Sequence, residues 1–157
     1  MTEDDFLKAI SIVDRYKAIN EIYQDILLFT DYGKNLYKVN AEQKVVFLIT
    51  RLESEVYNGG IDQYFYNSSG EYSHETLNAL KLINAPITLK ILEKAISYWP
   101  NSTVPKETSI RREELLDTVE KKAESEWEKL TKAYWDDEEN LFEKLFQFIL
   151  DNSIKFY

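Results

Sequence analysis

The strongest constraint on the fold is the placement of glycine, because three of the four glycines of this 157-residue chain lie between positions 59 and 70. Apolar residues with helical spacing lead up to the first of them, at Val46, Ile49, Leu52 and Val56. The sequence Asn58-Gly59-Gly60 predicts the end of that helix, since glycine readily takes the positive φ that a C-terminal cap requires. Residues 61–66 then read as one helical turn with three aromatic side chains, and residues 67–70 as a second turn. We expect an aromatic-bearing elbow here.

Helical periodicity covers almost the whole chain, and no segment alternates as a strand would. The predicted helical segments are residues 2–29, 40–58, 72–84, 86–99, 110–134 and a last helix from 136 onward. Thr2 and Asn40 have the side chains of helix N-caps, and Asp136 with Glu139 predicts the start of the last helix. One long bent helix and two shorter ones both fit residues 2–29. We expect an all-α single domain of residues 1–157, a compact bundle of about six or seven helices.

Composition narrows the classes of function. The chain has 28 acidic and 19 basic residues, a net charge of -9, which argues against direct binding to nucleic-acid phosphates. It has no cysteine, which excludes disulfides, thiolate catalysis and zinc–thiolate sites. His74 is the only histidine, so no imidazole pair can bind a metal, and turn serines such as Ser68 and Ser69 often lie near a histidine by chance. We expect a protein that is not an enzyme and has no metal or cofactor.

The sequence also predicts the compartment. No apolar run approaches the ~20 residues that a bilayer-spanning helix needs. Three of the first five residues are acidic, and this N-terminus lacks the basic-then-apolar form of a signal peptide. We therefore expect a cytoplasmic protein that does not contact a membrane.

The helix predicted for residues 110–134 carries a row of acids. Their spacing is four, three, four and four residues, at Glu113, Asp117, Glu120, Glu124 and Glu128, hereafter the acidic stripe. At ~100° per residue these five fall within a narrow sector of the helix. The apolar set expected to point inward is Leu116, Val119, Ala123, Trp127, Leu130 and Tyr134. The stripe is ~22 Å long, and one DNA strand presents about six phosphates over that length. A solvated helix face balanced by neighbouring lysines has the same pattern.

The run from Glu55 to Gly70 resembles the signature of a bacterial helical domain family named after a DNA-mimic protein. The matching positions are Glu55, Val56, Asn58, Gly59, Gly60, Gln63, Tyr64, Phe65, Asn67, Ser68, Ser69 and Gly70. Tyr57 stands where the family usually has Asn, and Ile61 where it usually has Phe. Arg111 or Arg112 resembles part of the family's C-terminal region, and the resemblance covers about residues 42–152. We call the positions from Asn58 to Gly70 in this match the motif elbow.

These observations favour a non-enzymatic, acidic protein-binding module. The resemblance implies a basic partner such as a DNA-binding regulator, whose DNA-contacting surface the acidic stripe would occupy as a DNA mimic. Two alternatives stay open: a small-ligand or enzyme module centred on Asn58–Asn67, and an immunity-type inhibitor of a toxin. Asp62 offers a carboxylate for a cation or polar ligand in the elbow, although a helix cap or turn hydrogen bond is its commoner role. The sequence also leaves open whether the chain forms a homodimer.

Overall fold

Helices make up all the regular structure in this computed structural model, which describes residues 1–136 and 138–157. In chain order they are α1 (Glu3–Ile10), α2 (Arg15–Phe29), α3 (Ala41–Tyr66), α4 (Ser73–Leu82), α5 (Pro86–Ile96), α6 (Thr108–Glu114), α7 (Glu120–Trp135) and α8 (Leu141–Asp151). A π-helical segment, η4 (Leu115–Val119), joins α6 to α7, so residues 108–135 form one continuous helix. Counted in this way, the described residues form seven helices, and the all-α prediction is confirmed.

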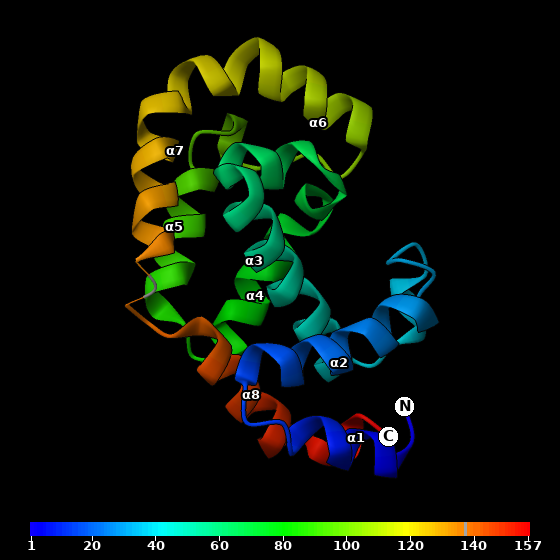
Figure 1. The fold of residues 1–157 in the computed structure, drawn as a ribbon. Helices are drawn as coiled ribbons and strands as arrows, with labels where there is room; N and C mark the ends of the chain where they lie inside the picture. Colours follow the sequence, from blue (N-terminus) through cyan, green and yellow to red (C-terminus); the bar gives the residue numbers. More distant parts are fainter. Residues whose placement is uncertain (137) are drawn as a thin grey trace.

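The central helix is α3, which runs through the middle of the molecule (Figure 1). It contacts α2, α4, α6, α7 and α8, and the continuous helix formed by α6, η4 and α7 curves around one side of it. The inward face of α3 is mainly apolar, and Ile49, Leu52 and Val56 on it are all buried. These side chains belong to one hydrophobic core that extends from Phe6 to Phe156. Near the termini, Phe6 and Phe156 stack with ring centroids 5.7 Å apart.

Capping side chains explain where the first helices begin. Thr2 accepts a hydrogen bond from the backbone N–H of Asp5 at the start of α1, and Asn40 caps α3 in the same way, as the sequence predicts. Asp14 caps a second helix, α2, so residues 2–29 form two helices and not one. Val13 lies in the link between these two helices and is exposed.

The predicted start of the last helix is wrong. α8 begins after Asn140, which adopts a positive φ of 53°, and the carboxylate of Glu139 is used elsewhere. Glu139 accepts hydrogen bonds from the backbone N–H groups of Ile87 (3.0 Å) and Thr88 (2.8 Å), in the first turn of α5. Pro86 is the first residue of α5, as expected. The backbone N–H groups of the next two residues have no partner within the helix, and the Glu139 carboxylate, distant in sequence, accepts their hydrogen bonds.

The long helix departs from the predicted phase at η4. It begins at Thr108 because Glu107 caps it, and hydrogen bonds from the Ser109 hydroxyl and the Ile110 N–H lower the pKa of the Glu107 carboxyl to about 2. Within η4 an extra residue enters the turn, which rotates the buried face by one position. As a result Leu115 is 2% exposed and Leu116 is 50% exposed, the reverse of the prediction at this point of the helix. Four others of the predicted inward set are buried as expected, Val119, Ala123, Trp127 and Tyr134.

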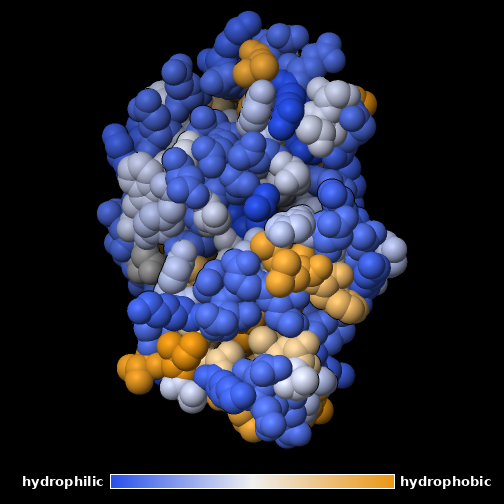
Figure 2. All heavy atoms as spheres, turned by 45° about the vertical axis from the view of Figure 1, so that its right-hand side comes forward, coloured by the Kyte–Doolittle hydropathy of each residue, from blue (hydrophilic) through white to orange (hydrophobic). Residues whose placement is uncertain are grey.

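Many of the exposed apolar side chains lie on or near α1 and α2. On the face in Figure 2 most of the hydrophobic surface lies in the lower half, at the level of α1 and α2 in Figure 1. Leu7, Leu28 and Phe29 of these two helices are each more than half exposed. A membrane span would need a longer apolar run than any helix in the described part of the chain offers.

Candidate functional site

The elbow is a break inside α3 and not the end of a helix. Within α3 only Gly60 has non-helical backbone angles, with φ 87° and ψ -176°. The positive φ is as predicted, but the conformation differs from the left-handed helix cap that the sequence suggested, and it is one that essentially only glycine adopts. The break frees the N–H of Ile61, which donates to the Thr131 hydroxyl on α7 at 3.2 Å. This hydrogen bond therefore connects the elbow to the helix that carries the acidic stripe.

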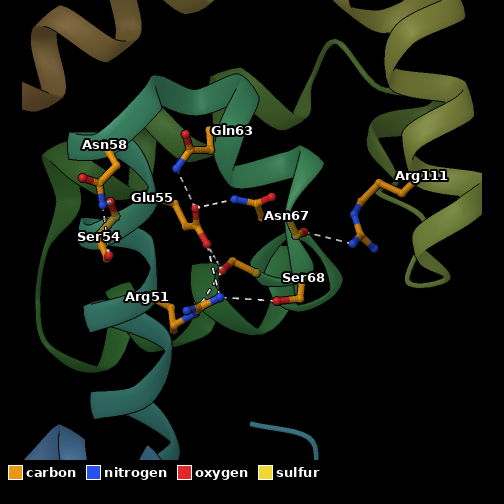
Figure 3. A network of polar contacts seen from close by, with 9 residues as sticks. Arg51, Ser54, Glu55, Asn58, Gln63, Asn67, Ser68 and Arg111 are labelled. Atoms are coloured by element: carbon orange, nitrogen blue, oxygen red, sulfur yellow. Dashed lines mark hydrogen bonds and ion pairs between the residues drawn. The ribbon is translucent and has the colours of Figure 1, made fainter. Parts of the chain in front are cut away.

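A buried carboxylate organises the inner side of the elbow (Figure 3). Glu55 is 6% exposed, and each of its two oxygens accepts two hydrogen bonds. Oε1 accepts from Arg51 at 3.2 Å and from the Ser69 hydroxyl at 3.0 Å. Oε2 accepts from the side-chain amides of Gln63 at 2.9 Å and Asn67 at 2.8 Å. All four lone-pair positions are used, so this charge is paired and fully hydrogen-bonded as burial requires.

Glycine at position 59 makes room for this network. A β-carbon there would lie 2.0 Å from Oε1 and 2.6 Å from Cδ of Gln63. The Gln63 side chain can therefore fold back toward Glu55 only because residue 59 has no side chain. The Asn58 side chain does not join the network around Glu55. It donates instead to the carbonyl of Ser54 at 2.7 Å, as Figure 3 also shows.

The aromatic residues of the elbow divide between core and surface. Tyr64 and Phe65 are buried, and the Phe65 ring lies 5.0 Å from Trp127 and 5.4 Å from Trp99 between ring centroids. The Tyr64 hydroxyl donates to Thr76 at 3.0 Å, and burial raises the pKa of that hydroxyl to about 12. These two rings therefore belong to the hydrophobic core.

A buried arginine holds the outer side of the elbow. Arg111 is 0% exposed and donates to backbone carbonyls of four residues, Phe65, Asn67, Pro105 and Lys106. Burial lowers the pKa of its guanidinium. A β-carbon on Gly70 would lie 2.7 Å from Nε of Arg111 and 2.6 Å from the Phe65 carbonyl, so this glycine is required for the close approach. Of the two arginines that the family resemblance left open, Arg111 is the buried one.

The residues considered for catalysis have structural partners. Ser68 accepts a hydrogen bond from Arg51 at 3.3 Å, and Ser69 bonds to Glu55. His74 accepts from the backbone N–H of Val104 through Nε2 at 3.2 Å. A cavity of about 340 Å³ lies beside the elbow and is lined in part by Arg51, Ser68 and Tyr64. Among residues 1–136 and 138–157, no three His, Asp or Glu side chains are arranged to hold a metal ion.

The acidic stripe lies on the surface of the long helix. Glu113, Asp117, Glu124 and Glu128 are exposed and Glu120 is half-buried. None of the five forms a salt bridge or side-chain hydrogen bond within the described residues. Within the described residues, the ion pair on this helix joins Glu126 to Lys129, outside the stripe. Neighbouring lysines therefore do not neutralise the stripe through direct pairing.

Three stripe residues also border a groove between α7 and the broken part of α3. The groove has a volume of about 440 Å³. Its lining residues on α7 include Glu120, Glu124, Glu128 and Trp135. The elbow contributes Gly59 and Asp62, so the structure brings the predicted elbow and the predicted stripe together at this one place.

Two residues that the elbow depends on, Glu55 and Arg111, are not among the candidate site residues that the sequence predicts. Glu55 belongs to the family motif but was not among the candidate site residues, although its place four residues after Arg51 predicts a helical ion pair. Asp62, for which the sequence allows a ligand contact but favours a helix cap or turn hydrogen bond, has an exposed side chain at the groove. No local signal shows that Arg111 is buried, because its partners lie more than 40 residues away as well as in the preceding loop.

We expect the substitution Gly60→Ala to destabilise the fold by about 1–3 kcal/mol, because an L-residue is strained at φ 87° and ψ -176°. Its β-carbon would also approach Thr131 Oγ1 at 3.3 Å, the acceptor for the Ile61 N–H. Urea unfolding of both proteins measures the difference. Ala133→Gly on the exposed side of α7 is the control for a glycine–alanine exchange in a helix. An unchanged denaturation midpoint for Gly60→Ala would show that the break is not under backbone constraint.

The fold and the site define an acidic all-α protein, in which a buried polar motif fixes a broken central helix and a row of surface carboxylates forms no ion pair within the described residues. Residues 38–152 match the family model described as DMP19-like protein, and this match covers α3 to α8. The chain therefore belongs to the DMP19-like protein family, the DNA-mimic family that the motif resembles. No curated protein and no solved structure gave a significant match.

Proposed function

We propose that this chain is a non-enzymatic protein-binding module that covers the basic, DNA-contacting surface of a DNA-binding protein. The observation that carries the proposal is the acidic stripe, five carboxylates that lie along one long helix with no ion-pair partner in the described part of the chain. Family membership supports the same reading, because the family is named after a DNA mimic. Unpaired surface carboxylates are available to arginine and lysine side chains in the way that phosphates are.

The arrangement of the helix supports a rigid display of these charges. The stripe spans about 22 Å by helix rise, a length over which one DNA strand presents about six phosphates. The helix that carries it packs on α3 and α5, and it is tied to the elbow through Thr131. A fixed backbone lets the carboxylates meet a partner without first losing conformational freedom, which favours affinity.

Charge neutralisation of the stripe should weaken the complex and leave the fold intact. We expect the fivefold variant Glu113→Gln, Asp117→Asn, Glu120→Gln, Glu124→Gln and Glu128→Gln to unfold within about 1 kcal/mol of the parent, since four of these groups are exposed, Glu120 is half-buried, and none forms an ion pair within the described residues. We expect its association rate with the partner to fall by about tenfold or more at low salt, because electrostatic steering is lost. The partner is first captured from lysate of the native cell at low salt and eluted at high salt, and surface plasmon resonance then gives the rates.

The control removes the same number of charges elsewhere. It replaces five exposed acids outside the stripe with their amides, at Glu3, Asp4, Glu21, Glu93 and Glu138. We expect this control to slow association much less than the stripe variant does. The deciding measurement is competition between this chain and the DNA site of the captured partner. Simultaneous binding of both, without mutual loss of affinity, would contradict the proposal.

A further inference from the structure

The groove beside the elbow has walls of two kinds. One wall is α7, which contributes Glu120, Glu124 and Glu128 together with two tryptophans. The other wall is the segment of α3 around the Gly60 break, which contributes Asp62. At about 440 Å³ the groove lies within the usual range of ligand pockets, roughly 300–1,000 Å³. It is large enough to admit a long side chain from another protein.

The aromatic part of the groove is held in place. Trp127 is buried beneath it, and Trp135 remains 46% exposed at its side. The indole N–H of Trp135 donates to the Val56 carbonyl at 3.2 Å, which fixes the ring against α3. A fixed, half-exposed indole offers an aromatic surface on which a planar cation can stack.

The charged side chains that line the groove are mostly acidic. Four carboxylates line it, and Lys132 is the one basic residue among its lining side chains. Asp62, Glu124 and Glu128 are exposed, and none of the four carboxylates pairs with a base within residues 1–136 and 138–157. An occupant with positive charge would therefore meet carboxylates on both walls.

We infer that this groove, hereafter the arginine seat, is a binding site for an arginine side chain of the basic partner. This inference rests on the proposed function. A guanidinium fits the groove better than an ammonium because it is planar, stacks on indole and donates to more than one carboxylate at once. The apolar stem of the arginine would lie along Trp127 and Trp135. The seat is formed only because α3 breaks at Gly60 and places Asp62 opposite α7.

This assignment divides the acidic stripe into two parts. Glu120, Glu124 and Glu128 border the groove and would contact the inserted arginine, whereas Glu113 and Asp117 lie outside it and would contribute long-range attraction only. Loss of an acid from the groove should therefore raise the dissociation rate, and loss of an acid outside it should mainly reduce the association rate.

The test uses two blocked peptides, hexa-arginine and hexa-lysine, titrated into the full-length chain at about 0.15 M salt with tryptophan fluorescence as the readout. Trp135 is the most exposed of the three tryptophans, so an occupied groove changes its emission. We expect the arginine peptide to bind at least about threefold more tightly than the lysine peptide, in keeping with a stacked cation. Equal affinity for the two peptides would overturn the inference.

Two charge-matched double variants locate the site. We expect Asp62→Asn with Glu124→Gln to weaken arginine-peptide binding by about tenfold, and Glu113→Gln with Asp117→Asn by about twofold or less. Equal losses would show diffuse attraction to an acidic surface and would also overturn the inference. Trp135→Ala tests the stacking separately, and its circular dichroism spectrum shows whether it folds.

Binding and DNA-competition experiments with the captured partner distinguish failure of this inference from failure of the proposed function. If DNA competes for the partner but the groove variants bind it normally, the proposed function stands and the arginine seat is wrong. If the arginine peptide needs the groove but DNA and this chain bind the partner together, the seat stands as a cation site and the DNA-mimic proposal fails.

Discussion

The substitution Glu55→Ala is expected to lower the free energy of unfolding by about 3–5 kcal/mol, the usual cost of removing one partner of a buried ion pair. Its carboxylate accepts four hydrogen bonds, from Arg51, Gln63, Asn67 and Ser69. Without it the half-buried guanidinium of Arg51 loses its counter-charge, and the other donors lose their acceptor. Thermal unfolding followed by circular dichroism, together with urea titration, measures the loss.

Two further variants make this expectation specific to the charge and to the site. Glu55→Gln keeps the shape but cannot accept all four hydrogen bonds, because its amide nitrogen is a donor, so we expect an intermediate loss. Glu124→Ala removes an exposed acid of α7 and should change stability by less than about 0.5 kcal/mol. A stability change for Glu55→Ala as small as that for Glu124→Ala would contradict a structural role for this carboxylate.

The substitution Arg111→Ala is expected to have an effect of similar size, a loss of about 3 kcal/mol or more. It leaves the carbonyls of Phe65, Asn67, Pro105 and Lys106 without this donor. The hydrogen bond to Phe65 is buried and the other three are part-buried, and an unsatisfied buried group costs about 1–3 kcal/mol. It also leaves a cavity next to Gly70. Guanidinium chloride unfolding provides the measurement.

The neighbouring arginine supplies the matched control. Arg112 lies 4.3 Å from the ring centroid of Tyr66 and donates to the Tyr66 carbonyl, but it is only half-buried. We expect Arg112→Ala to cost about 1 kcal/mol or less. We also expect Arg111→Lys to restore little, because an ammonium cannot reproduce the fixed fork of donors. Equal effects at positions 111 and 112 would argue against the buried role of Arg111.

The sequence predicts those parts of the fold that depend on neighbouring residues. The caps at Thr2 and Asn40, the proline start of α5 and the positive φ at Gly60 all follow from side chains and backbone preferences within a few positions. The helical class follows because apolar periodicity sums over many residues, so errors at single positions average out.

The parts that sequence reasoning missed depend on distant residues. Glu139 has the spacing of a local cap, yet its carboxylate binds N–H groups more than 50 positions earlier in the chain. The four-residue spacing from Leu115 to Val119 predicts no π turn, because a regular helix fits Leu116 with Val119 equally well. Arg111 and its carbonyl partners meet only through the tertiary fold. For the acidic stripe, the structure places its residues on the surface, but which molecule they bind is a question of recognition that no intramolecular contact answers.

The π turn at η4 has a consequence for the lengths that related chains can have. A π turn holds one residue more than an α turn, so removing one residue from η4 would restore a regular helix and leave α7 in nearly the same rotation relative to α6. Trp127 would stay in the core, and Thr131 would still meet the freed N–H of Ile61. Related chains that are one residue shorter across residues 115–119 should therefore keep the same fold, with a regular α-helix in place of the π turn.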